Sequence, residues 1–269
     1  MSLTNSNHRV GLIGAGVMGE ALLSGLINAG FPANQISIYE KRPERAVEIT
    51  SKYKVNNSQI DELCEISDVV LLVTKPQDLG ELLDNISSKV KSNVLLVSFA
   101  AGKTIDFISK KISNAKVIRV MPNTPILVNK GASAISVGEG VSVEQQSFVL
   151  EFLNSCGKAI VVKEDLQDAV TATSGSGPAY FFAFVESMVK GAVNLGLSEE
   201  VATQLTVQTL VGAAELLQTS GKRATTLREN VTSPNGTTFA ALQSFAASDL
   251  EQIVASAMKA ARDRSIELS

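Results

Sequence analysis

The chain has 269 residues, of which 45% are hydrophobic and 19% charged, and its formal net charge at pH 7 is −3. This balance is typical of a globular protein with one large domain or two smaller ones. Charges of both signs are interspersed and only 5% of the residues are aromatic. We therefore expect no nucleic-acid partner, because such partners require basic stripes and stacking rings.

The chain also lacks the marks of a membrane or secreted protein. Its apolar runs are far shorter than the roughly 20 residues of a membrane-spanning helix, and the N-terminal sequence MSLTNSNHR is polar. We predict a cytoplasmic protein with no membrane partner. Cys64 and Cys156 have no metal-ligand spacing, so we interpret both as small buried residues and predict no metal site. His8 lies in the polar leader and is expected to be solvated, which removes the commonest general base.

Short apolar runs alternate with helical stretches as far as residue 163. The runs are RVGLIG (9–14), QISIYE (35–40), DVVLLVT (68–74), NVLLVS (93–98), KVIRVM (116–121), ASAISV (132–137) and KAIVVK (158–163). This alternation is typical of a parallel sheet covered by helices on both faces. Helix signals agree: Gly30 ends a helix, Pro43 opens another, and Ser142 with Gln145 forms a capping box. The sequence predicts a doubly wound, Rossmann-type α/β domain over residues 1–163.

After residue 163 the β-branched runs stop and helical periodicity takes over. We expect helices over residues 179–195, over residues 198–219 and from residue 238 to the C-terminus. These helices are apolar around much of their circumference, more than about 100 residues folding alone would need to hide. The sequence predicts an all-α domain over residues 164–269, part of whose surface is covered by a second subunit.

A glycine motif follows the first predicted strand directly. VGLIGAGVMG places Gly14, Gly16 and Gly19 at the start of a helix, and the acidic Glu40 ends the second strand. This context favours a dinucleotide site. Gly14 would make the tight turn, Gly16 would let the backbone approach the pyrophosphate, and Gly19 would allow close helix packing. The amides of residues 15–18 would face the phosphates at the helix N-terminus.

The residues after the second strand give conflicting signals on the cofactor. Glu40 would accept hydrogen bonds from the adenine ribose and repel a 2′-phosphate. Lys41 and Arg42 would attract a 2′-phosphate, or would only form a solvated turn. These residues leave the choice between NAD and NADP open.

Loops later in the chain supply candidate residues for the pocket around the nicotinamide ring of such a cofactor. TKP (74–76), SFAAG (98–102) and MPNTP (121–125) follow predicted strands, and their small residues would let a flat ring lie close. SGSGPAY predicts a loop over residues 174–177 with Pro178 in the first turn of a helix. Each segment could alternatively be only loop punctuation.

Six motifs occur in one order over nearly the whole chain: GAGVMG, VTKP, SFAAG, RVMPNTP, SGSGPAY and VTSPNGTT. Together they resemble the pyrroline-5-carboxylate reductase family, the last enzymes of proline biosynthesis. The resemblance implies a dinucleotide-binding domain followed by a helical dimerisation domain, in a homodimer or a larger ring of dimers. It also implies hydride transfer from NADPH, with NADH possible, to the imine carbon of 1-pyrroline-5-carboxylate.

The resemblance assigns site residues as well. Residues 233–238 would hold the substrate carboxylate with amides and hydroxyls, as a helix N-terminus favours, and Thr238 would face the ring nitrogen as the catalytic residue. The implied substrate-binding residues are Glu164, Asn230, Ser233, Gly236, Thr237 and Thr238. The predicted cofactor-binding residues are Gly14, Ala15, Gly16, Val17, Met18, Gly19, Glu40, Lys41, Arg42, Asn56, Val73, Thr74, Lys75, Pro76, Phe99 and Ala101.

The chain departs from the family pattern in two places. Asn235-Gly236 stands where many members have Gly-Gly, but Asn tolerates the left-handed conformation, so we expect the turn to survive. Glu-Lys-Arg stands after the second strand in place of the usual polar and basic residues, which puts the NADPH preference in question. Two other functions stay open: a β-hydroxyacid-type dehydrogenase with Lys190 as its base, and a nucleotide-sensing module without turnover.

Overall fold

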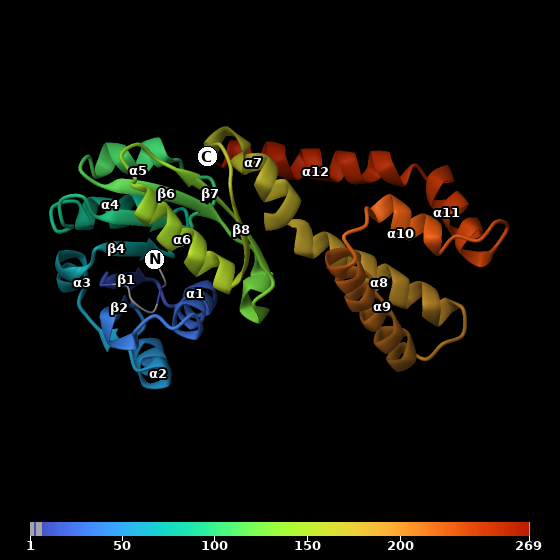
Figure 1. Cartoon of the computed structure of the whole chain (residues 1–269), viewed down its shortest axis with the longest axis horizontal. Coiled ribbons are helices and arrows are strands. Elements are labelled where there is room, and N and C mark those ends of the chain that lie inside the picture. Colours follow the sequence, from blue (N-terminus) through green and yellow to red (C-terminus); the bar gives the residue numbers. More distant parts are fainter. Residues whose placement is uncertain (1–2, 4–6, 269) are drawn as a thin grey trace. The chain divides into compact units, whose positions relative to one another are not determined.

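The computed structural model describes residue 3 and residues 7–268, and its chain divides into two compact units (Figure 1). Unit 1 is drawn from Met1–Pro178 and Ala261–Ser269, and unit 2 is Ala179–Ala260. Residues 164–178 therefore group with unit 1, whereas the sequence suggested a boundary between residues 163 and 164. That boundary stays a prediction about domain organisation.

Within the described residues, unit 1 contains one eight-stranded sheet with the strand order β3-β2-β1-β4-β5-β6-β7-β8. Its neighbours pair in parallel except β6 and β7, which are antiparallel. The strands are β1 (Val10–Ile13), β2 (Ile36–Tyr39), β3 (Asn56–Asn57), β4 (Val69–Leu72), β5 (Leu95–Ser98), β6 (Lys116–Met121), β7 (Gly131–Val137) and β8 (Gly157–Val161). The predicted parallel sheet is confirmed, with the antiparallel β6–β7 pair and the short β3 as features that the apolar runs did not indicate.

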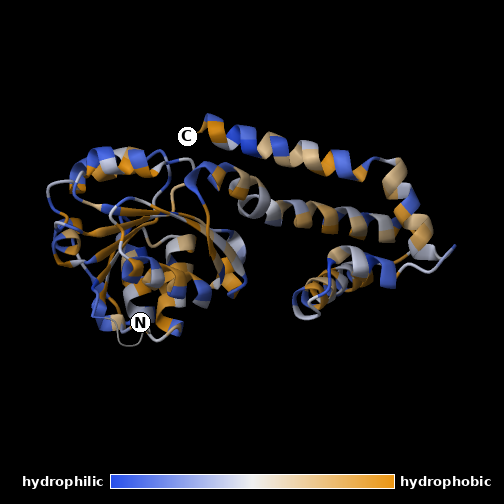
Figure 2. Ribbon diagram, turned by 45° about the horizontal axis from the view of Figure 1, so that its top comes forward, coloured by the Kyte–Doolittle hydropathy of each residue, from blue (hydrophilic) through white to orange (hydrophobic). Residues whose placement is uncertain are grey.

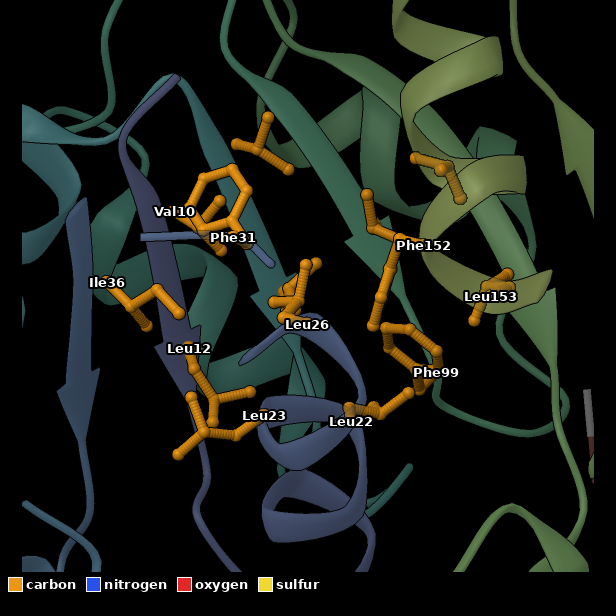
Figure 3. Packing of buried hydrophobic residues seen from close by; sticks show 14 of the residues in the cluster. Val10, Leu12, Leu22, Leu23, Leu26, Phe31, Ile36, Phe99, Phe152 and Leu153 are labelled. Carbon is orange, nitrogen blue, oxygen red and sulfur yellow. The ribbon is translucent and has the colours of Figure 1, made fainter. Parts of the chain in front are cut away.

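Helices cover both faces of this sheet. They are α1 (Val17–Asn28), α2 (Pro43–Tyr53), α3 (Ile60–Ile66), α4 (Leu79–Ile86), α5 (Ile105–Lys111), α6 (Val143–Ser155) and α7 (Gln167–Val170). Successive strand residues point to opposite faces, so Leu12 packs with α1 and α6 while Ile13 packs with α3, α4 and α5. Figure 3 shows part of the first of these two clusters, which includes Leu22 and Leu26 of α1 and Phe152 of α6.

Local signals account for several boundaries. The capping box predicted at Ser142 and Gln145 is present and opens α6, and Pro43 is the first residue of α2. Cys64 and Cys156 are buried as expected. His8 is half-buried and packs edge-on against Phe148, so the prediction that it is solvated was wrong.

Unit 2 is helical, as predicted. Its elements are α8 (Gly177–Asn194, which begins in unit 1), α9 (Glu199–Thr219), α10 (Ala224–Asn230), α11 (Thr237–Ala247) and α12 (Leu250–Glu267, which ends in unit 1). The sequence pattern suggested one helix from residue 238 to the end, but Asp249 has a left-handed backbone (φ 54°) and separates α11 from α12. Ser198 caps α9 by accepting a hydrogen bond from Val201.

The helices of unit 2 carry many hydrophobic residues (Figure 2), and several of these side chains are exposed in the single chain. Phe181 and Phe182 of α8 are about three-fifths exposed, and Leu205 of α9 and Ile253 of α12 are each 57% exposed. Isolated globular units rarely leave such contiguous apolar surface in water. Among the described residues, no helix is long and apolar enough to cross a membrane.

Candidate active site

The glycine loop has the backbone geometry that a dinucleotide requires. It joins the end of β1 to the start of α1, and Gly14 turns the chain with a φ of +97°. A Cβ on Gly14 would meet the carbonyl of Val73, and one on Gly19 would strike the carbonyl of Gly14. A Cβ on Gly16 would lie within 4 Å of no described atom. The open space beside Gly16 is therefore where a pyrophosphate can approach the backbone.

The start of α1 offers hydrogen-bond donors. Gly16 is the N-cap residue and, in the described part of the chain, no side chain caps the helix. The first amides of a helix have no partner four residues earlier, so they can donate to an anion. One predicted donor is an exception: the amide of Ala15 donates to Glu40 Oε2 at 3.0 Å. The amides left for phosphate are those of residues 16–18.

Glu40 is more enclosed than the sequence suggested. Its side chain is 8% exposed, and its second carboxylate oxygen accepts hydrogen bonds from the backbone and side chain of Arg42. Burial raises the pKa of Glu40, but the hydrogen bonds from Arg42 and Ala15 outweigh it and hold the pKa below its usual value. Lys41 and Arg42 are exposed. Glu40 is thus a fixed anion beside the loop, with Arg42 as its counter-charge.

Other predicted cofactor residues fall into three groups. Val73 and Thr74 follow β4, next to the glycine loop, and the buried hydroxyl of Thr74 has no hydrogen-bond partner among the described residues. Phe99 is only 8% exposed and its side chain belongs to the core, which leaves its backbone to face a cofactor. Asn56 donates to the carbonyls of Asn34 and Ile36, at the opposite end of β2 from Glu40. The structure therefore does not bring the Asn56 side chain to this site.

A cleft of about 470 Å³ lies in unit 1 beyond the carboxyl ends of β4 and β5. Pro76 and Ala101, both predicted, line it. Other lining residues are Lys103, Ser176, Ala261, Arg264 and Ser265 of α12, and Leu268 directly after that helix. Ligands of open α/β sheets bind at this edge. The contribution of α12 was missed, because no local signal tells that the end of the last helix returns to the sheet.

The MPNTP and SGSG segments meet in the fold. Asn123 donates to the carbonyl of Ser174 at 3.0 Å and accepts from the amide of Ala132 at 2.8 Å. The sequence suggested a loop over residues 174–177, but Thr171–Gly175 forms a π-helical turn that leads into α8. Gly175 permits this contact, because a Cβ there would collide with Met121.

In unit 2, the turn before α11 has the features of an anion cradle. Asn235 has a left-handed backbone (φ 56°), as expected, and the amide of Gly236 donates to Ser233 O at 3.1 Å. Gly236 is the N-cap of α11, and no described side chain caps that helix. Thr237 is exposed and Thr238 half-buried. The first amides of α11 and these hydroxyls can together hold a carboxylate.

Three further candidates lie in different surroundings. Asn230 is the exposed last residue of α10, and Lys190 is exposed on α8. Glu164 lies in unit 1, where its carboxylate accepts a hydrogen bond from the amide of Ile105 at 2.7 Å and pairs with the buried Arg119 at 3.3 Å. These contacts indicate a structural role for Glu164. Within residues 3 and 7–268, no group of three His, Cys, Asp or Glu side chains is placed to hold a metal ion.

Comparison with known proteins adds an independent finding. Residues 164–268 match the family described as "Pyrroline-5-carboxylate reductase dimerisation", and residues 9–102 match "NADP oxidoreductase coenzyme F420-dependent". The chain is 39% identical over 267 residues to a pyrroline-5-carboxylate reductase of Pseudomonas aeruginosa, covering 98% of each chain.

Solved structures give the same result. A pyrroline-5-carboxylate reductase from Coxiella burnetii is 31% identical with a TM-score of 0.94, over 98% of this chain and 99% of that one. The enzyme from Plasmodium falciparum with NADP bound is 32% identical with a TM-score of 0.85, over 97% and 98% of the two chains.

Proposed function

Because this chain belongs to the pyrroline-5-carboxylate reductase family, we propose that it reduces the C=N bond of 1-pyrroline-5-carboxylate. The product is L-proline, and the reaction is the last step of proline biosynthesis. Bound NAD(P)H supplies the hydride that the imine carbon receives. The chain's own residues bind both molecules and orient them, which is the main source of rate in such a reaction.

The observation that carries this proposal is a pair of helix N-termini that no described side chain caps, each preceded by a glycine. Gly16 precedes α1 and Gly236 precedes α11. The first supports pyrophosphate binding, since the space beside Gly16 is open. The second supports binding of the substrate carboxylate by Ser233, Thr237 and the first amides of α11.

Thr238 is the residue that we assign to the ring nitrogen of the substrate. It lies in the first turn of α11 and is half-buried. A protonated imine is already electrophilic, so its nitrogen needs a fixed hydrogen-bond partner and no strong acid. This role requires a hydroxyl at one position, and it agrees with a chain that has a single histidine.

We further propose a homodimer, or a larger ring of dimers, in which the exposed apolar faces of α8, α9 and α12 are covered by another copy of the chain. Light scattering of the purified chain should then give at least twice the 28.4 kDa of one chain. The cytoplasmic location and the NADPH preference stay predictions. Cell fractionation tests the first, and parallel kinetics with NADPH and NADH test the second.

The decisive experiment measures NADPH and NADH oxidation by the purified chain on addition of 1-pyrroline-5-carboxylate. We expect turnover with at least one cofactor, and a fall of about 100-fold in kcat for Thr238→Ala because the nitrogen loses its positioning partner. Thr219→Ala, at the exposed end of α9, is the matched control and should keep the parent rate. A folded chain that binds a dinucleotide but turns over neither cofactor would contradict the proposal.

A further inference from the structure

Ala15, the middle residue of the glycine loop, is held at both ends of its backbone by charged side chains. Its amide donates to Glu40 Oε2 at 3.0 Å, and its carbonyl accepts from Arg45 Nε, also at 3.0 Å. Both are charge-assisted hydrogen bonds, a class that is stronger than neutral ones. Gly14 and Gly16 flank Ala15 and give the loop many accessible conformations, so these two bonds select one of them.

Each of the three guanidinium nitrogens of Arg45 has a hydrogen-bonding or ion-pair partner. While Nε holds the carbonyl of Ala15, one terminal nitrogen pairs with Glu20 of α1 and the other pairs with Glu48 at 2.8 Å. The side chain of Arg45 is 17% exposed. Such a planar fork of donors is a property of arginine that lysine does not share. Arg45 therefore ties α2 to α1 and to the loop between β1 and α1.

Glu20, the partner of Arg45 on α1, is itself held in place. It accepts hydrogen bonds from Lys52 Nζ at 2.7 Å and from the Tyr53 hydroxyl at 3.0 Å. The hydrogen bond from Lys52, helped by Arg45 and Tyr53 and opposed by burial, lowers the pKa of Glu20 to about 2. The Glu20 carboxylate is thus charged at any physiological pH, and its ion pair with Arg45 persists over that range.

The bond to Ala15 has a geometric consequence for the neighbouring amide. In a trans peptide, the C=O of one residue and the N–H of the next point in opposite directions. With its carbonyl directed at Arg45, Ala15 must turn the N–H of Gly16 away from Arg45. Gly16 N–H is one of the donors that we assign to the pyrophosphate, and its orientation is set before any cofactor binds.

We propose that Arg45 is a positioning residue that fixes the glycine loop in the conformation that binds the dinucleotide pyrophosphate. This role rests on the proposed function, since it concerns the same cofactor site. Preorganisation of this kind removes the ordering cost of the loop from the binding step. The pyrophosphate is common to NADPH and NADH, so Arg45 supports both cofactors equally and does not choose between them.

The test compares cofactor binding and kinetics in the full-length chain. For Arg45→Gln, we expect the Kd of both NADPH and NADH in calorimetric titration, and the KM of both, to rise about tenfold, or about 1.4 kcal/mol. The kcat at saturating cofactor and the KM for 1-pyrroline-5-carboxylate should stay within about twofold of the parent, because Arg45 acts only on cofactor binding. Arg45→Lys keeps the positive charge, so it serves as a second variant in case Arg45→Gln does not fold. It should still raise both Kd values at least about fivefold, since one ammonium cannot serve three partners.

Glu48→Gln is the matched control. Glu48 is 58% exposed and contacts the same guanidinium, and we expect its replacement to leave the bond between Arg45 and Ala15 in place. Its Kd values should stay within about twofold of the parent, because Glu48 is exposed and contacts Nη1, whereas Ala15 is held by Nε.

Four results would overturn the role. Parent-like Kd values in both Arg45 variants would show that the loop needs no anchor, and an equal loss in Glu48→Gln would show a general effect on α2. A loss confined to NADPH would make Arg45 a ligand of the 2′-phosphate. If the parent chain bound neither dinucleotide, the proposed function would fail as well, whereas the other results leave that function standing.

Discussion

The carboxylate of Glu40 forms an ion pair with the guanidinium of Arg42 at 3.0 Å, and the two groups differ greatly in exposure. The side chain of Glu40 is 8% exposed and that of Arg42 is 65% exposed. In the sequence, Glu40 favours NAD and Arg42 favours NADP. In the structure the two charges pair with each other, so each weakens the effect that the other would have on the cofactor. If a 2′-phosphate bound beside Arg42, it would meet a guanidinium that is already shared with a buried anion.

This pairing predicts the effect of removing the anion. In Glu40→Gln, Arg42 is released from its partner and the repulsion of a 2′-phosphate disappears, while the amide oxygen can still accept from Ala15. We expect the ratio of kcat/KM for NADPH to kcat/KM for NADH to rise about tenfold. Glu44→Gln, in the exposed first turn of α2, is the control and should leave the ratio unchanged. An unchanged ratio in Glu40→Gln would show that residue 40 does not face the ribose.

Two glycines of the motif after β1 should respond differently to replacement by alanine. A Cβ on Gly16 meets no described atom within 4 Å, and its φ of −66° suits any residue. We expect Gly16→Ala to keep the parent's thermal stability but to weaken NAD(P)H binding at least about tenfold, because the methyl occupies the space of the pyrophosphate.

Gly19→Ala should behave differently, because its Cβ collides with the carbonyl of Gly14. Such overpacking costs about 1–3 kcal/mol of unfolding free energy. Thermal unfolding and cofactor titration of both variants test the pair. Equal losses of stability in the two variants would contradict the view that the space beside Gly16 is open and the space beside Gly19 is filled.

The features that the sequence could predict are those carried by neighbouring residues. The capping box at Ser142, the left-handed Asn235 and the glycine turn after β1 each depend on a few adjacent residues, and the structure contains all three. Apolar runs located seven of the strands for the same reason. The directions of the strands could not be predicted in the same way, because nothing in the run ASAISV indicates that β7 is antiparallel to β6.

The parts that could not be predicted depend on contacts between distant residues. Arg45 meets Ala15 and Glu20 across 30 and 25 positions, and no motif marks that convergence. The same holds for Asn123, whose amide joins two segments that looked like separate loops. Phe99 was assigned to the cofactor from its place in a motif, whereas the burial of its ring depends on packing against α1 and α6.

The Glu20 cluster predicts a stability change in acid. The pKa of Glu20 is about 2, below its ordinary value of 4.5, so its stabilising effect is complete above pH 4.5 and is lost as the pH falls toward 2. The side chain is 20% exposed and Lys52 is 57% exposed. After allowance for solvent screening, we expect the loss to be about 1–2 kcal/mol of unfolding free energy.

Urea unfolding at about pH 5 and about pH 3 measures this effect. Other carboxylates also titrate there, so the informative quantity is the difference between the parent and Glu20→Gln. The parent should lose about 0.5–1 kcal/mol more than the variant over this interval, because only about half of the total loss falls between pH 5 and pH 3. Parallel losses in both proteins would mean that Glu20 does not contribute to acid stability.

Asn235 offers a test of the carboxylate cradle that leaves its polar groups in place. Its left-handed φ of 56° suits glycine and asparagine, and costs a β-branched residue about 1–2 kcal/mol or more. We expect Asn235→Gly to keep the KM for 1-pyrroline-5-carboxylate within about twofold and Asn235→Val to raise it about tenfold, because the turn must open and move the amides of Thr237 and Thr238. The KM for NAD(P)H should not change in either.

Asn93→Val is the matched control for this variant. Asn93 also has a left-handed backbone, with a φ of 66°, but it lies in the turn before β5, at the end of the sheet away from the glycine loop. It should lose comparable stability without a change in either KM, because only the strain is shared. If both valine variants raised the KM for 1-pyrroline-5-carboxylate, the effect would come from general destabilisation, and the turn before α11 would lose its assignment as the carboxylate cradle.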